Sequence, residues 1–155
     1  HQMADHLALK GRKKIALLAP PPHLNYYRHM VAGFYEGVNS RDISGMVIEE
    51  VDLDSSLEEI REYIANLMRS DDRPDGIICS GSAAALAVVS GVEDAKMELG
   101  REVDVAAKQS TQILHWFRPE LIVVEENFKL AGQQLGKAVL GAIAGEEVST
   151  LQSIG

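Results

Sequence analysis

Cysteine, aromatic residues and long hydrophobic runs are all scarce in this chain of 155 residues. Its one cysteine, Cys79, excludes an internal disulfide framework and fits the reducing cytosol. The longest apolar stretches, such as Ile15–Pro22, are far shorter than the ~20 residues that a membrane span needs. No signal peptide is recognisable, because Lys10–Lys14 precede too short an apolar run and no small-residue cleavage site. We therefore expect a cytoplasmic protein with no membrane partner.

Several motifs that carry enzyme chemistry are also missing. Neither G-x-G-x-x-G after the first apolar run nor G-x-x-x-x-G-K-[ST] occurs, so nucleotide cofactors are not supported and we expect none. The five histidines lack metal-ligand spacing. Ser80 and Ser82 lie outside the G-x-S-x-G pattern of a nucleophile elbow, and Cys79 is expected to be a small core residue. These absences favour a binding protein over an enzyme.

Basic residues are outnumbered, with Lys+Arg 15 against Asp+Glu 23 and a net charge of −8. Clustered Lys and Arg drive non-specific nucleic-acid binding. This chain is therefore not expected to bind DNA by itself, which leaves open DNA binding by a segment outside it.

Short apolar runs alternate with helical patterns along the whole chain. Five runs are typical of buried strands: Ile15–Ala19, Met46–Val51, Gly76–Cys79, Val103–Ala107 and Leu121–Val124. Apolar residues at helical spacing predict helices over Gln2–Lys10, Tyr27–Val38, Leu57–Leu67, Ala83–Leu99 and Phe128–Ile143. Ser55 or Ser56 is expected to cap the third of these helices and Ser82 the fourth. The alternation predicts an α/β fold, with a doubly wound, mostly parallel sheet covered by helices on both faces.

Ligands of such sheets bind outside the carboxyl ends of the strands. The segments there are Pro20–Arg28, Asp52–Ser55, Ser80–Ser82, Lys108–Thr111 and Glu125–Phe128. The Ser80–Ser82 turn fits equally a ligand contact or a plain helix cap. Lys108 is either a ligand for a carboxylate or phosphate or a solvated charge at a strand end.

The loop after the triple proline carries aromatic and amide side chains that suit a small-molecule site. They are His23, Asn25, Tyr26, Tyr27 and Arg28. The alternative is an ordinary loop with a helix cap at Asn25.

A second apolar cluster, Ile113, Leu114, Trp116 and Phe117, precedes Arg118 in a stretch that we expect to be a loop. It fits either the core or a contact between subunits.

Four segments in order resemble the lac-repressor (LacI/GalR) family of bacterial transcription regulators. Gly11–Leu18, GRKKIALL, resembles the family's "GHRRIALL" strand, and Val31–Phe34 resembles its "RLAGF" helix. Arg73–Ile78 resembles "RPTAIF". Asn127–Gly132 resembles the segment after the family's "PLTTV" strand, for which Pro119–Val124 stands here.

The resemblance implies a periplasmic-binding-protein-like type I subdomain. Family members have an N-terminal helix-turn-helix domain and two α/β subdomains hinged around a small effector. Residues 1–126 resemble the C-terminal effector-binding subdomain, and residues 127–155 the return segment toward the other subdomain. The chain ends as Val148–Ile154 begins to resemble a strand, which fits a piece of a longer protein. The implied function is a sensor that couples a sugar-like effector to operator DNA through a domain outside this sequence; the alternative is a periplasmic-type sugar-binding protein of an ABC transporter.

The resemblance also implies an effector site with altered chemistry. Met30 replaces an arginine that clasps effector hydroxyls, with Arg28 as the nearest substitute, and Ser80–Ser82 replaces the family's "AND" turn. Lys108 replaces the aspartate of "GFDD", which suggests an anionic effector such as a sugar acid or sugar phosphate. The effector-binding residues implied are Tyr26, Arg28, Leu53, Ser80, Ser82, Lys108, Glu126 and Phe128.

Family members dimerise side by side, through the helix after the third strand and the loop after the fourth. The resemblance therefore implies a homodimer. The interface residues expected are Ala85, Val88 and Val92 from the helix and Leu114, Trp116 and Phe117 from the loop.

Overall fold

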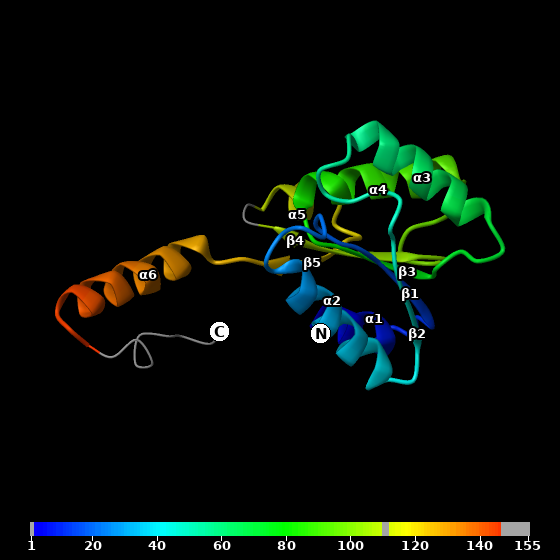
Figure 1. Ribbon diagram of the computed structural model, residues 1–155. Coiled ribbons are helices and arrows are strands. Elements are labelled where there is room, and N and C mark those ends of the chain that lie inside the picture. The colour runs from blue at the N-terminus through cyan, green and yellow to red at the C-terminus, as the bar shows by residue number, and fades with distance from the viewer. Residues whose placement is uncertain (1, 110–111, 147–155) are drawn as a thin grey trace. The chain divides into compact units, whose positions relative to one another are not determined.

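A computed structural model describes residues 2–109 and 112–146 (Figure 1). The strand expected over Val148–Ile154 lies outside the described residues, as do Ser110 and Thr111 of the fourth loop. The chain divides into two compact units, His1–Glu125 and Glu126–Gly155. All strands belong to the first unit, and the described part of the second unit holds a single helix.

The first unit is built on a 5-stranded sheet in the order β2-β1-β3-β4-β5. Its strands are β1 (Lys14–Leu18), β2 (Ser44–Val47), β3 (Gly76–Cys79), β4 (Asp104–Gln109) and β5 (Ile122–Glu125). All neighbouring pairs are parallel, which confirms the predicted α/β fold. The second strand begins earlier and ends earlier than predicted. β2 is a half-exposed strand at the edge of the sheet, so the run of apolar residues in the sequence does not coincide with the ends of the strand.

Helices cover both faces of the sheet (Figure 1). They are α1 (Gln2–Leu9), α2 (Tyr27–Asn39), α3 (Leu57–Arg69), α4 (Ser82–Asp94) and α5 (Ile113–Phe117), and α6 (Phe128–Ile143) forms the second unit. α1 and α2 lie on one face, and α3 and α4 on the other. The stretch expected to be a loop, 113–117, is instead the short helix α5, which begins where the amide of Leu114 donates to Oε1 of Gln109 at 3.2 Å.

Side chains alternate along the buried strands. In β1, Ala16 and Leu18 pack toward α3 and α4, whereas Ile15 and Leu17 pack toward α1 and α2. On the first of these faces α3 and α4 approach closely at Gly91, where a Cβ atom would lie 2.6 Å from the carbonyl oxygen of Arg61. The two cores fix the sheet between its helices and so determine where each strand ends.

Helix boundaries follow local hydrogen bonds. α3 begins with a capping box, in which the amide of Glu59 donates to Oγ of Ser56 and its carboxylate accepts from the amide of Ser56. Ser82, expected to cap α4, does not do so, because Gly81 occupies the cap position and the Ser82 hydroxyl bonds elsewhere. α4 ends at Asp94, earlier than predicted, because Lys96 turns the chain through a left-handed conformation with φ 63°.

Candidate functional site

The carboxyl edge of the sheet contains a topological switch point. β2 lies on one side of β1, and β3 lies on the other side. The chain therefore leaves β1 in one direction and leaves β3 in the opposite direction, so the loops after these two adjacent strands lead away from each other. Open α/β sheets bind ligands in the crevice at this point.

The loop after β1 and the start of α2 enclose a surface hollow. Its lining residues are Pro22, His23, Leu24, Asn25, Arg28 and His29. Tyr26, not Asn25, occupies the cap position of α2; its side chain makes no capping hydrogen bond and is 51% exposed. Met30 packs against the core beneath α2, which explains why an apolar residue stands there. The loop thus presents imidazole, amide and guanidinium groups to solvent beside the switch point.

The turn after β3 is held against two neighbouring strands. Oγ of Ser80 donates to the carbonyl oxygen of Leu18 at 3.0 Å, and Oγ of Ser82 donates to that of Lys108 at 2.9 Å. Because each hydroxyl donates its hydrogen to a backbone carbonyl, its oxygen can only accept further hydrogen bonds. Such acceptors suit a ligand rich in hydroxyl groups.

Leu53 lies over this turn from the loop after β2. Its Cδ1 and Cδ2 atoms lie 3.4 and 3.5 Å from the place where a Cβ on Gly81 would be, which is ordinary van der Waals distance, so Leu53 lies directly beside the turn. The structure therefore brings Leu53, Ser80 and Ser82 together at one edge, as the sequence predicts for a site there.

Lys108 lies near the end of β4 and is half-buried. Alternation along β4 places its side chain on the face covered by α1 and α2, with Ala106, while Ala107 packs toward α3 and α4. The next residue, Gln109, is buried and accepts the amide of Leu114, so its role is to hold α5.

Glu126 and Phe128 belong to the second unit. Phe128 is 62% exposed, and α6 begins where the Asn127 side chain accepts the amide of Leu130 at 2.9 Å. Their contribution to an effector site remains a prediction.

Most of the expected dimer interface lies in the core of the first unit. Ala85, Val88, Val92 and Leu114 have 0% of their surface exposed, so they offer nothing to a partner. The three α4 residues are apolar because α4 packs against both α3 and the sheet, and Leu114 of α5 belongs to the same core. Trp116, by contrast, is 75% exposed, and the side chain of Phe117 lies outside the described parts.

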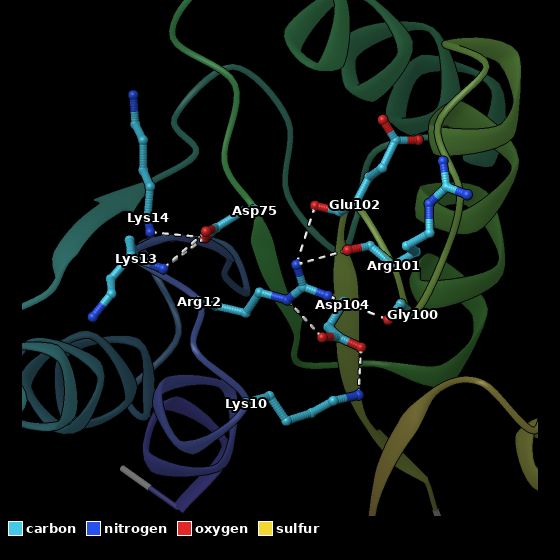
Figure 2. Close-up of polar contacts among 9 residues, drawn as sticks. All are labelled: Lys10, Arg12, Lys13, Lys14, Asp75, Gly100, Arg101, Glu102 and Asp104. Carbon is cyan, nitrogen blue, oxygen red and sulfur yellow. Dashed lines mark hydrogen bonds and ion pairs between the residues drawn. The ribbon is translucent and has the colours of Figure 1, made fainter.

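A buried polar cluster lies at the opposite edge, where the strands begin (Figure 2). Asp104 accepts hydrogen bonds at 2.6 Å from both Lys10 and Arg12. Burial raises the pKa of Asp104, but the hydrogen bonds from Lys10 and Arg12 together outweigh it, and the pKa falls below its usual range. The sequence signal was a carboxylate inside a predicted apolar strand, which needs buried partners, but no pattern identified Lys10 and Arg12 as those partners.

A second carboxylate at this edge, also drawn in Figure 2, binds two backbone amides. Asp75, before β3, accepts the amides of Lys13 and Lys14 at 2.8–3.0 Å. Asp104 and Asp75 thus connect the start of β1 to β4 and β3. Both carboxylates are engaged in hydrogen bonds within the chain, so their role here is structural.

The described residues include neither a reactive cysteine nor a group of metal ligands. Burial raises the pKa of Cys79 to about 12, so its thiolate is not accessible near neutral pH. Across residues 2–109 and 112–146, no group of three His, Cys, Asp or Glu side chains is arranged to hold a metal ion. Within the same residues, no helix is both long and apolar enough to cross a bilayer.

Known proteins share this fold. The model of the periplasmic binding protein-like domain matches residues 4–153. The lactose operon repressor of Escherichia coli (strain K12) is 22% identical over 144 residues, which are 93% of this chain and 39% of that protein.

Two solved structures have closely similar architecture. A LacI family transcriptional regulator from Bifidobacterium animalis subsp. lactis superposes with a TM-score of 0.82 and 24% identity, over 95% of this chain and 53% of that one. A periplasmic binding protein/LacI transcriptional regulator from Alkaliphilus metalliredigens was solved in complex with D-xylulofuranose. It superposes with a TM-score of 0.73 and 21% identity, over 95% of this chain and 55% of that one. This chain therefore spans about half the length of these solved chains. The match over residues 4–153, together with the parallel sheet, establishes that the chain belongs to the periplasmic binding protein-like domain family.

Proposed function

We propose that this chain is the effector-binding part of a LacI-type transcriptional regulator and has no enzymatic activity. The observation that carries the proposal is the similarity to the lactose operon repressor, which extends over 93% of the chain. The polar groups at the carboxyl edge of the sheet supply the site. A helix-turn-helix domain outside this sequence would bind operator DNA, in keeping with the net charge of −8 here.

The proposed mechanism is a shift in population. An effector held between this subdomain and a second one would favour one relative arrangement of the two, and that arrangement would bind DNA with a different affinity. The chain's own role is to hold its side of the ligand at Ser80, Ser82 and Leu53. Hydrogen bonds hold Ser80 to β1 and Ser82 to β4, and Leu53 lies beside the turn at Gly81.

The effector we propose is a sugar acid or sugar phosphate. Lys108 is a half-buried cation at the end of β4, and a charge-assisted hydrogen bond from an ammonium to a carboxylate or phosphate is stronger than one between neutral groups. The relative from Alkaliphilus metalliredigens was solved with a sugar, which supports the broader class.

Ligand binding by the chain tests this proposal. Neutral sugars, sugar acids and sugar phosphates are compared by calorimetry on the wild type, Lys108→Gln and Lys13→Gln. Lys13 is the control because it is a lysine at the opposite edge of the sheet. We expect tighter binding of an anionic sugar, about tenfold weaker in Lys108→Gln and unchanged in Lys13→Gln. A preference for neutral sugars, or equal affinity in all three proteins, contradicts the anionic effector.

Operator binding by the longer protein that contains this chain tests the regulatory role. The effector should change its affinity for operator DNA. A periplasmic-type sugar-binding protein, the alternative that shares this fold, would bind the same sugar with no response from DNA.

We also propose that the regulator is a homodimer in cytoplasm. Trp116 and Ile113, which are 75% and 47% exposed, are large apolar side chains of the kind that anchor interfaces. They replace the buried residues of α4 as the candidate contact.

A further inference from the structure

The loop between β2 and α3 carries Leu53 on a turn, residues 52–55, that its own side chains close. The carboxylate of Asp52 accepts the amide of Asp54 at 2.8 Å, and Oγ of Ser55 accepts the amide of Asp52 at 3.0 Å. Because these bonds lie within the turn, they give it a shape but do not attach it to the rest of the protein. The place of Leu53 therefore depends on the contacts that fasten the turn from outside.

Two backbone attachments and one apolar contact fasten the turn. The amide of Leu53 donates to the carbonyl oxygen of Ala19 at 3.3 Å, which is long for such a bond. On the side of α3, the capping box of Ser56 and Glu59 fixes the end of the loop. On the side of β2, Val51 packs in the core, a contact that has no preferred direction. The stretch that enters the turn thus needs a directional contact to fix it.

A tyrosine of α3 supplies that directional contact. Oη of Tyr63 donates to Oε2 of Glu50 at 2.7 Å, three residues before Leu53 in the loop. Tyr63 follows the buried Ile60 by three positions, so its ring lies at the margin of the buried face of α3 and packs against the core. The core therefore keeps the donor in place, and the donor keeps the loop in place.

Charge strengthens the contact between the two side chains. Burial and the hydrogen bond to Glu50 raise the pKa of Tyr63 to about 12, and the same hydrogen bond lowers the pKa of Glu50. Near neutral pH the phenol therefore keeps its proton while the carboxylate is ionised. A hydrogen bond from a neutral hydroxyl to a carboxylate is stronger than one between two neutral groups.

We propose that Tyr63 and Glu50 are positioning residues of the effector site, which together hold Leu53 beside the Ser80–Ser82 turn. The inference deepens the proposed function, on which it rests for the role of Leu53. The pair acts through the loop and not by contact with the ligand. Without the hydrogen bond, the turn that carries Leu53 would move away from Gly81 and widen the site.

NMR measures the placement of Leu53 without any ligand. In the wild type, the Leu53 methyl groups should give nuclear Overhauser effects to the α protons of Gly81, because Cδ1 lies 3.4 Å from the position of a Cβ there. Tyr63→Phe removes only the hydroxyl and keeps the ring, so it should fold and should weaken these signals. Glu50→Gln keeps an oxygen that can accept from Tyr63, so it should retain most of the wild-type signal.

A loss of stability alone would not move Leu53 in the folded protein, so the controls test position. Glu50→Ala should weaken the Leu53 signals as Tyr63→Phe does. Tyr35→Phe removes a tyrosine hydroxyl from α2, on the other face of the sheet, and Glu49→Ala removes the exposed carboxylate next to Glu50. Both controls should leave the Leu53 signals unchanged, and equal weakening in either of them would overturn the proposal.

Glucose 6-phosphate, titrated by calorimetry, separates this inference from the proposed function. Binding that is about three- to fivefold weaker in Tyr63→Phe than in the wild type supports both. Equal affinity in the two proteins, or Leu53 signals that Tyr63→Phe leaves unchanged, overturns the positioning role while sugar sensing stands. If the Leu53 signals weaken but glucose 6-phosphate binds neither protein, Tyr63 and Glu50 still position Leu53, and the anionic effector is wrong.

Discussion

Nε of Arg12 lies 2.6 Å from Oδ2 of Asp104, a carboxylate with 0% of its side chain exposed. The same guanidinium donates to the carbonyl oxygens of residues 100–102, so a single side chain fixes the turn before β4. Lys10 binds the other carboxylate oxygen at 2.6 Å. Through these two contacts Asp104 joins the segment after α1 to the start of β4, although the two are far apart in the sequence.

Removal of the Asp104 charge should destabilise the protein. Asp104→Asn leaves Lys10 and Arg12 without their shared carboxylate, and we expect a loss of about 1–3 kcal/mol in the free energy of unfolding. Urea unfolding followed by circular dichroism measures it. Asp72→Asn is the control, because Asp72 pairs with Lys14 while 80% exposed, and it should change stability by less than about 0.5 kcal/mol. Equal effects in the two variants would contradict a special role for the buried carboxylate.

The same carboxylate gives the stability a pH dependence. The pKa of Asp104 is lowered on folding, so the unfolded chain takes up its proton at higher pH than the folded one. The stabilisation is present above the unfolded pKa, about 4, and is lost as pH falls through the folded value. Urea unfolding at pH 7, 4 and 3 should show the difference between wild type and Asp104→Asn shrinking with acid. A difference that is independent of pH would refute this assignment.

Gly91 should not tolerate a side chain. A Cβ there would meet the Arg61 carbonyl oxygen at 2.6 Å and Cβ of Ile64 at 2.9 Å, so α3 and α4 would have to separate. We expect Gly91→Ala to cost about 1–3 kcal/mol despite its better helix propensity. Thermal unfolding compares it with Ser90→Ala, a half-buried neighbour in the same helix, which should stay within about 0.5 kcal/mol. A stabilised Gly91→Ala would show that the helices have room to move.

Trp116 and Leu114 should respond in opposite ways to a charge, although they lie two residues apart. Trp116→Asp should fold normally and, in sedimentation, dissociate the proposed dimer, because the indole is 75% exposed. Leu114→Asp should unfold the protein, because Leu114 is completely buried and an unpaired charge there has no partner. A dimer that persists in Trp116→Asp would place the contact elsewhere.

The thiol of Cys79 should be inert in the folded protein. It is fully buried, and burial raises its pKa to about 12. A thiol reagent should react only as fast as the protein opens, and much faster in denaturant. Rapid labelling of the native protein would contradict the position of β3 in the centre of the sheet.

The sequence by itself determined the alternation of strands and helices, and with it the parallel sheet. Runs such as Gly76–Cys79 are buried on both faces, so their apolar composition reports their position directly. It also located Ser80 and Ser82 at the carboxyl edge, since the ends of parallel strands must meet there.

The tertiary structure alone decided which apolar residues are available to a partner and which charges are satisfied. Val88 and Trp116 are equally apolar in the sequence, yet one packs between α3 and the sheet and the other faces solvent. Arg12 and Arg28 are equally basic, yet of the two only Arg12 pairs with a carboxylate among the residues that the structure describes. The reason is physical: burial and ion pairing depend on contacts between residues distant in the chain, and local patterns carry no information about which distant groups meet.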